Sequence, residues 1–179
     1  MGPGTTVAVS AHGYGDEEAF DYRAHKTGHL VIKPKNGKEF LAMLSGVSAT
    51  FGAISLIKVF AHSYPRGIIM TNWSGFYDEP GPKDTAMAAY VIDLEELIKK
   101  GKIKFSPNPR WMLFGCNLAG RFSEKLSLAV SGTVIAPRGD SFPQIAGNRE
   151  TGVFISVYRW EVFVKGKYAY SLGKKLRAW

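Results

Sequence analysis

Two apolar segments in the middle of the chain constrain the fold most strongly. Residues 53–61 (AISLIKVFA) and 110–115 (RWMLFG) are apolar over most of their length, as expected of strands that are covered on both faces. Such strands belong to the centre of a parallel sheet, in which a crossover connection, usually a helix, joins each strand to the next. The two segments therefore predict an α/β fold.

The segments around these two strands alternate between strand and helix patterns. Further strands are expected at residues 6–10, 29–33 and 133–136, and helices at 38–47, 85–100 and 123–130. The β-rich residues 153–164 are expected to complete the sheet as a hairpin or a long edge strand. This order predicts a three-layer α/β/α sandwich with a mostly parallel central sheet.

The length of the chain, 179 residues, fits one domain. We expect residues 1–179 to form it, alone or as part of a longer protein. The longest apolar runs are far shorter than the roughly 20 residues that span a bilayer, so no membrane span is expected. The N-terminal MGPGTT lacks the basic start and the apolar stretch of a secretory signal.

Cys116 is the single cysteine of the sequence. An internal disulfide is therefore excluded, and the fold does not depend on oxidation. A reactive thiol works in a reducing compartment, which predicts a cytoplasmic location, either in the producing cell or in a cell into which the protein is delivered.

The chain is basic, with a formal net charge of +8 and an isoelectric point near 9.6. Such a charge attracts acidic partners, but the basic residues are scattered. Their densest group lies near the C-terminus and contains Lys165, Lys167, Lys174, Lys175 and Arg177. Because no zinc-finger spacing, aromatic nucleic-acid signature or acidic calcium loop accompanies them, we expect no nucleic-acid partner, no metal and no cofactor.

Two reactive side chains follow the two central strands. His62 comes directly after residues 53–61, and Cys116 comes directly after residues 110–115. In open α/β sheets, functional groups gather outside the carboxyl ends of the strands. A thiol needs a base to become a thiolate near neutral pH, and imidazole suits that task. If the two strands are neighbours, the sequence predicts a Cys116–His62 pair on one rim.

The residues around Cys116 strengthen this interpretation. Gly115-Cys116-Asn117 and then Gly120 precede a helix, which places the thiol on a tight turn with N–H groups that suit an anion. Taken alone, Cys116 fits a buried structural thiol and His62 fits a core or rim histidine. His12 competes as the base or as a pocket residue, because it also ends a strand and is followed by a glycine.

The order of these elements resembles the caspase-like superfamily of cysteine peptidases. In that family a strand and histidine precede a strand and cysteine by about 50 residues, as His62-Ser63 and Phe114-Gly115-Cys116-Asn117 do here. The segment FGCNLAG, followed by a helix and a strand, is similar to the separase-related and bacterial CHAT-type caspase-like groups. The resemblance covers roughly residues 5–160. Papain-like and cell-wall amidase-like folds place the cysteine first, so the order counts against them.

The resemblance implies a peptidase mechanism. The Cys116 thiolate would attack a peptide carbonyl, the Cys116 and Ser63 amides would stabilise the oxyanion, and His62 would protonate the leaving amine. The family commonly has glycine where Ser63 stands, but serine also supplies an N–H. The dyad of this family usually needs no third residue, and none is assigned.

Polar residues elsewhere suggest a substrate pocket. Related enzymes often place specificity residues near the position of Arg138 and Asp140. Asp140 would accept a basic P1 side chain and Arg138 an acidic one, or both belong to a polar turn. Asp16, Glu17 and Glu18 are expected to form a solvated acidic loop.

These observations predict a cysteine endopeptidase that acts on a protein or peptide, as a bacterial effector, a toxin or a self-processing protease. Two alternatives remain open. A non-peptidase enzyme would use the same dyad for another acyl transfer, and an inactive caspase-like binding module would use the basic surface to bind nucleic acid.

Overall fold

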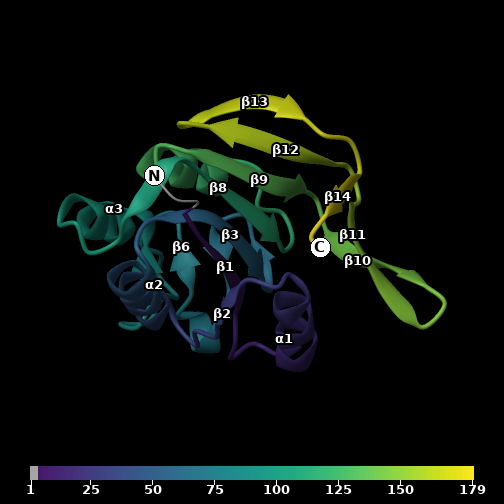
Figure 1. Cartoon of the computed structure of the whole chain (residues 1–179), viewed down its shortest axis with the longest axis horizontal. Helices are drawn as coiled ribbons and strands as arrows, with labels where there is room; N and C mark the ends of the chain where they lie inside the picture. Colours follow the sequence, from purple (N-terminus) through teal and green to yellow (C-terminus); the bar gives the residue numbers. More distant parts are fainter. Residues whose placement is uncertain (1–3) are drawn as a thin grey trace.

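A seven-stranded sheet forms the centre of the computed structural model, which describes residues 4–179 (Figure 1). Residues 1–3 of the N-terminal segment lie outside the described part. The strands are β1 Thr5–Ser10, β2 Leu30–Ile32, β3 Ile54–Phe60, β8 Phe105–Phe114, β9 Thr133–Arg138, β12 Arg159–Val164 and β13 Lys167–Ser171. Their order is β13-β12-β9-β8-β3-β1-β2. The strands from β2 to β9 pair in parallel, whereas β12 and β13 pair antiparallel with their neighbours.

Helices α2 (Gly37–Phe51), α3 (Val91–Lys99) and α4 (Arg121–Ala129) pack on one face of this sheet. The amphipathic pattern of α2 directs Phe40, Leu41, Leu44 and Val47 into the core. The Asn36 side chain caps this helix by accepting a hydrogen bond from the Glu39 N–H at 2.8 Å. The helix predicted over residues 38–47 is therefore present and extends further at both ends.

The opposite face is covered by α1 (Glu17–Lys26) together with a second sheet of three strands. These strands are β10 Ser141–Ala146, β11 Arg149–Ser156 and β14 Lys175–Arg177. Figure 1 shows α1 and the second sheet on the side of the central sheet away from α2. The mixed α/β fold and the mostly parallel sheet were predicted correctly, but this face is not covered by helices alone.

Two segments differ from the prediction. Residues 153–164 form neither a hairpin nor one edge strand, because β11 lies in the second sheet and β12 in the central one. The chain changes sheets at the buried Ser156, whose hydroxyl donates to the carbonyls of Arg138 and Arg159. The helix expected from residue 85 begins only at Val91, where the Asp93 carboxylate accepts from the Tyr90 N–H.

Residues 63–90, which were expected to be a loop over most of their length, form a small sheet beyond β3. Its strands are β4 Ser63–Tyr64, β5 Gly67–Ile68, β6 Phe76–Tyr77 and β7 Ala89–Tyr90, and a short 3₁₀ helix spans Thr71–Trp73. Arg66 holds the segment together by pairing with Asp84 at 2.8 Å. Because the Asp84 side chain is 2% exposed, this ion pair is shielded from solvent, and it links the turn between β4 and β5 to the loop before β7.

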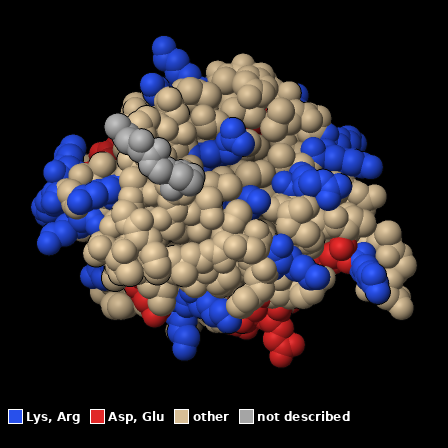
Figure 2. All heavy atoms as spheres, viewed as in Figure 1, with Lys and Arg blue, Asp and Glu red and all other residues tan. Residues whose placement is uncertain are grey.

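The outer surface agrees with the scattered charge of the sequence. Figure 2 shows lysines and arginines spread over the visible face rather than gathered in one patch. Within residues 4–179, no helix combines the length and apolar character required to cross a membrane.

Glu161 joins the ends of β9 and β12 from a nearly buried position, with 2% of its side chain exposed. Its carboxylate accepts hydrogen bonds from Arg138 at 2.7 and 2.9 Å and from Arg159 at 2.8 Å. The hydrogen bonds from Arg138 lower the pKa of Glu161, outweighing the effect of its burial. Arg138, a predicted pocket residue, is thus engaged in a structural ion pair.

We predict that Glu161→Gln lowers the free energy of unfolding at pH 7 by about 1–3 kcal/mol, because both arginines lose a charged partner. Since the folded state has the lower pKa, the wild-type contribution is present above the unfolded pKa of about 4.3 and is lost as pH falls through the folded pKa. Urea unfolding between pH 3 and 7 measures this. The control Glu96→Gln removes an exposed carboxylate on α3, and an equal loss in both variants would contradict the prediction.

Candidate active site

His62 and Cys116 follow neighbouring parallel strands. Phe60 of β3 lies opposite Phe114 of β8, and their rings stack with centroids 5.1 Å apart. Because side chains alternate between the two faces of a sheet, the residues two positions further on continue on the same face. The Phe20 ring contact of His62 and the Ser141 contact of Cys116 agree with this placement. The structure therefore brings His62 and Cys116 to one rim and one face.

This rim is also where the strand order reverses. From β1 the chain runs to β2 on one side of the sheet, whereas from β3 it runs to β8 and β9 on the other. Connections diverge at such a point, and open α/β sheets bind ligands there. His12 and His62 are each the second residue after one of these strands, β1 and β3 respectively.

Ser63 ties the two strand ends together. Its hydroxyl donates to the Cys116 carbonyl at 2.8 Å and accepts from the Cys116 N–H. Gly115 allows this approach, because a Cβ at that position would lie 2.2 Å from the Ser63 Oγ. The glycine before the cysteine is thus required by the close contact between the two strand ends.

The two amides predicted to bind an oxyanion differ in their surroundings. The Cys116 N–H is engaged by the Ser63 hydroxyl. The Ile69 N–H donates to the His62 carbonyl at 2.9 Å, so His62 and Ile69 form a hydrogen-bonded pair of the β4–β5 hairpin. Because hydrogen-bonded and non-hydrogen-bonded pairs alternate along antiparallel strands, the next pair, Ser63 and Ile68, is a non-hydrogen-bonded one. The Ser63 N–H is therefore directed away from β5, and the Cys116 N–H becomes available only when the Ser63 hydroxyl moves.

His62 is held by groups that precede or belong to α1. Its Nε2 lies 2.8 Å from the Asp16 carboxylate, and its ring makes edge contacts with Phe20 at 5.2 Å and Tyr14 at 5.6 Å between centroids. Because Asp16 accepts the Nε2 proton, Nδ1 is the ring nitrogen left to take another. Asp16 is thus a site residue that the sequence did not reveal.

The acidic loop is solvent-exposed at Asp16 and Glu18, as expected, but its carboxylates also make contacts within the fold. Besides Asp16, Glu17 accepts a hydrogen bond from the Gly13 N–H at 2.8 Å, which closes the turn before α1. One signal was present in the sequence: Asp16 lies shortly after the first strand, at the same carboxyl rim as His62.

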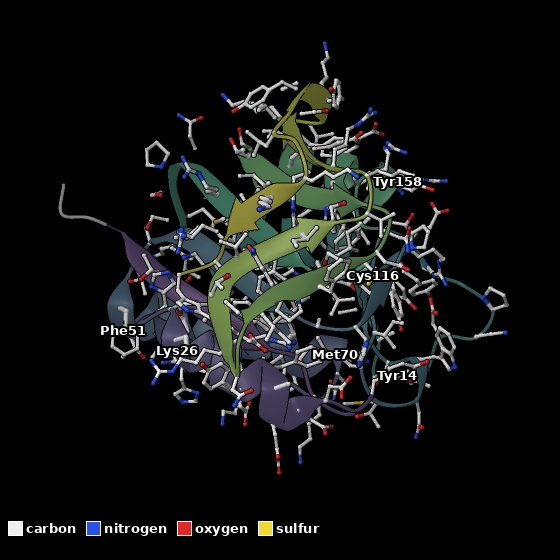
Figure 3. The ribbon with its side chains drawn as sticks, turned by 90° about the vertical axis from the view of Figure 1, so that its right-hand side faces the viewer. Tyr14, Lys26, Phe51, Met70, Cys116 and Tyr158 are labelled. Carbon is white, nitrogen blue, oxygen red and sulfur yellow. The ribbon has the colours of Figure 1, made fainter. Side chains whose placement is uncertain are left out.

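The Cys116 thiol is half-buried. Burial raises the pKa of Cys116, and the neighbouring Asp140 carboxylate raises it further, although a hydrogen bond from the Ser141 backbone acts in the opposite direction. The Sγ also lies 3.8 Å from the Ser141 carbonyl oxygen. Within residues 4–179, no hydrogen bond joins Cys116 to His62, and the sulfur instead contacts the Ser141 carbonyl. Figure 3 shows Cys116 on this rim, between Tyr14 and Tyr158.

His12, the competing base, has a separate partner. Its Nε2 lies 2.8 Å from Asp21, which also accepts hydrogen bonds from Ser10 and Lys33. Burial alone would raise the pKa of Asp21, but the hydrogen bonds from Lys33, Ser10 and His12 outweigh it and hold the pKa well below its usual range. His12 therefore belongs to a charge cluster and follows β1, whereas His62 follows β3, the strand that pairs with the strand leading to Cys116.

Asp140, the second predicted pocket residue, is hydrogen-bonded to Asn117, the residue that follows Cys116. Its carboxylate accepts from the Asn117 side chain at 2.9 Å, and the Asn117 N–H donates to the Gly139 carbonyl at 2.8 Å. Arg138 is occupied by Glu161, so Asp140 is the charged group that faces the nucleophile. Within residues 4–179, no cluster of three or more histidine, cysteine or acidic side chains is arranged to hold a metal ion.

Neither a protein-family model, nor a curated protein, nor a solved structure matches this chain. The functional argument therefore depends on the geometry of the rim.

We predict that Asp140→Asn lowers the pKa of Cys116 and speeds its alkylation by iodoacetamide at pH 7.5, because a negative charge beside the sulfur is removed. The rate measured against pH gives the pKa directly. Glu124→Gln, which removes an exposed carboxylate on α4, serves as the charge-matched control. Identical alkylation profiles for both variants and the wild-type protein would contradict this placement of Asp140.

Proposed function

We propose that the chain is a cysteine endopeptidase of caspase-like type, with Cys116 as the nucleophile and His62 as the general base and acid. One observation carries the proposal: His62 and Cys116 extend from neighbouring parallel strands on the same face of the sheet. The histidine-before-cysteine order and the Gly115-Cys116-Asn117 turn support it.

The reaction follows from the atoms at the rim. His62 Nδ1 takes the Cys116 thiol proton as the sulfur attacks the peptide carbonyl carbon. The N–H groups of Ser63 and Cys116 stabilise the oxyanion, and His62 then gives its proton to the leaving nitrogen as the C–N bond breaks. Water, deprotonated by His62, hydrolyses the thioester and regenerates the thiol.

Asp16 acts as a positioning residue in this mechanism. By accepting the Nε2 proton it keeps Nδ1 free to act as a base, and its charge stabilises the imidazolium that forms. The aromatic contacts from Tyr14 and Phe20 hold the ring in the same orientation.

The observed arrangement corresponds to a resting state. The Cys116 N–H is engaged by Ser63, and burial disfavours the thiolate. Substrate binding displaces the Ser63 hydroxyl, frees the Cys116 amide and brings the thiol to His62. Because the nucleophile is a thiol, the protein works in a reducing compartment, for which we propose the cytoplasm.

A second candidate function is supported by the same resting geometry. An inactive relative that only binds its partner would also show a thiol whose pKa is raised by burial and no hydrogen bond between the two residues. Catalytic variants separate the two candidates.

We predict that the wild-type protein hydrolyses peptides in a mixed library and that Cys116→Ala and His62→Ala each reduce the rate by roughly 10³-fold or more. Mass spectrometry of the products measures the cleavage. His25→Ala, an exposed histidine on α1, serves as the control and keeps its activity. Absence of cleavage by the wild-type protein, or equal cleavage by Cys116→Ala, would favour the binding module.

We further predict that Asp16→Asn lowers kcat roughly 10- to 100-fold with little change in KM, because the imidazole loses its orientation and its charged partner. Steady-state kinetics on one cleaved peptide measure this. The control variant Glu18→Gln removes a neighbouring exposed carboxylate, and we expect it to keep the wild-type kcat. A wild-type kcat in Asp16→Asn would rule out the positioning role.

A further inference from the structure

Three partly exposed aromatic side chains form a continuous surface beside His62. This ring group consists of Tyr14, Tyr64 and Trp73. Tyr14 contacts the His62 ring at 5.6 Å and the Trp73 ring at 6.4 Å, and Trp73 contacts Tyr64 at 5.7 Å between centroids. Figure 3 shows Tyr14 on the same side of the molecule as Cys116. The ring group therefore begins at the proposed base.

The backbone that presents Trp73 is strained. Asn72 and Trp73 both have left-handed conformations, with φ of 47° and 58°. This conformation is unusual for a bulky residue, and such strain persists at functional sites where the surrounding structure enforces it. Two hydrogen bonds enforce it here: the Ser74 N–H donates to the Thr71 carbonyl at 2.9 Å, and the Thr85 N–H donates to the Trp73 carbonyl at 3.4 Å.

Gly13 brings the two loops of the ring group together. A Cβ at this position would lie 1.7 Å from the Thr71 Oγ1, and the φ of Gly13 is +93°. Only glycine lets the segment after β1 approach the turn that carries Trp73. The contact between Tyr14 and Trp73 is thus built by two segments that are far apart in the sequence.

Polar groups hold the rings in place while apolar surface remains exposed. Arg66 donates to the Tyr64 hydroxyl at 3.2 Å, and the Lys83 Nζ lies 5.8 Å from the centre of the Trp73 ring. The Tyr14 side chain is 50% exposed, in contrast to the neighbouring Tyr77, which is fully buried. Ordered aromatic rings with open apolar area are suited to bind an apolar side chain.

The mechanism places one half of the substrate against these rings, so this inference rests on the proposed function. His62 protonates the leaving nitrogen, and the leaving half of the peptide therefore starts at His62. Tyr14 packs directly on His62, so the ring group lies next to the place where the leaving half of the peptide begins. We propose that the ring group binds an aliphatic or aromatic side chain of the substrate within two residues after the scissile bond.

The test uses the whole chain and a library of peptides from a tryptic digest of a bacterial lysate. New N-termini are sequenced by mass spectrometry after incubation with the wild-type protein and with Tyr14→Ser, Trp73→Ser and Tyr170→Ser. Tyr170 is an exposed tyrosine on the edge strand β13 and is the matched control. We expect the wild-type protein to favour leucine, isoleucine, phenylalanine or tyrosine at the first or second new position.

Trp73→Ser and Tyr14→Ser should each reduce this preference by roughly tenfold, whereas Tyr170→Ser retains it. Cleavage without an apolar preference at these positions, or a preference unchanged in Trp73→Ser, would overturn the ring-group proposal and leave the peptidase proposal intact. If the wild-type protein cleaves no peptide, the peptidase proposal fails and the ring-group proposal fails with it.

Discussion

The parallel pairing of β3 with β8 is the constraint on which the proposed site depends. The stacked rings of Phe60 and Phe114 fix the register of the two strands. Since side chains alternate along a strand, this register also fixes the face on which His62 and Cys116 emerge. The same pair of strands therefore determines both the packing of this part of the core and the positions of the two proposed reactive residues.

The burial that positions the thiol also opposes its ionisation. Burial and the Asp140 carboxylate raise the pKa of Cys116, while Ser63 engages the backbone N–H that an oxyanion would need. The contact of Asp16 with His62 fixes the orientation of the imidazole. A substrate that displaces the Ser63 hydroxyl would shift the balance toward the ionised pair, so catalysis would depend on an occupied site.

Strands and helices are predicted most accurately from the sequence where the local pattern of apolar residues matches their burial in the fold. Residues 53–61 and 110–115 are apolar because both faces of a central strand are covered, and both segments are strands. Helix α1 was missed because only Phe20 and Ala24 of its residues are buried. Asp16 was missed because its contact with His62 depends on the strand order, which brings the segments after β1 and β3 together. No local pattern encodes that order.

The most direct test of the central claim measures whether positions 62 and 116 face each other. A disulfide forms only when the two Cα atoms lie within about 7 Å, and Cys116 is the single native cysteine. We predict that His62→Cys loses both free thiols on mild oxidation and forms an intramolecular disulfide detected by mass. Ser131→Cys, an exposed position just before β9 at the opposite end of the sheet, keeps its thiols free within the monomer. Two persistent free thiols in His62→Cys would contradict the account.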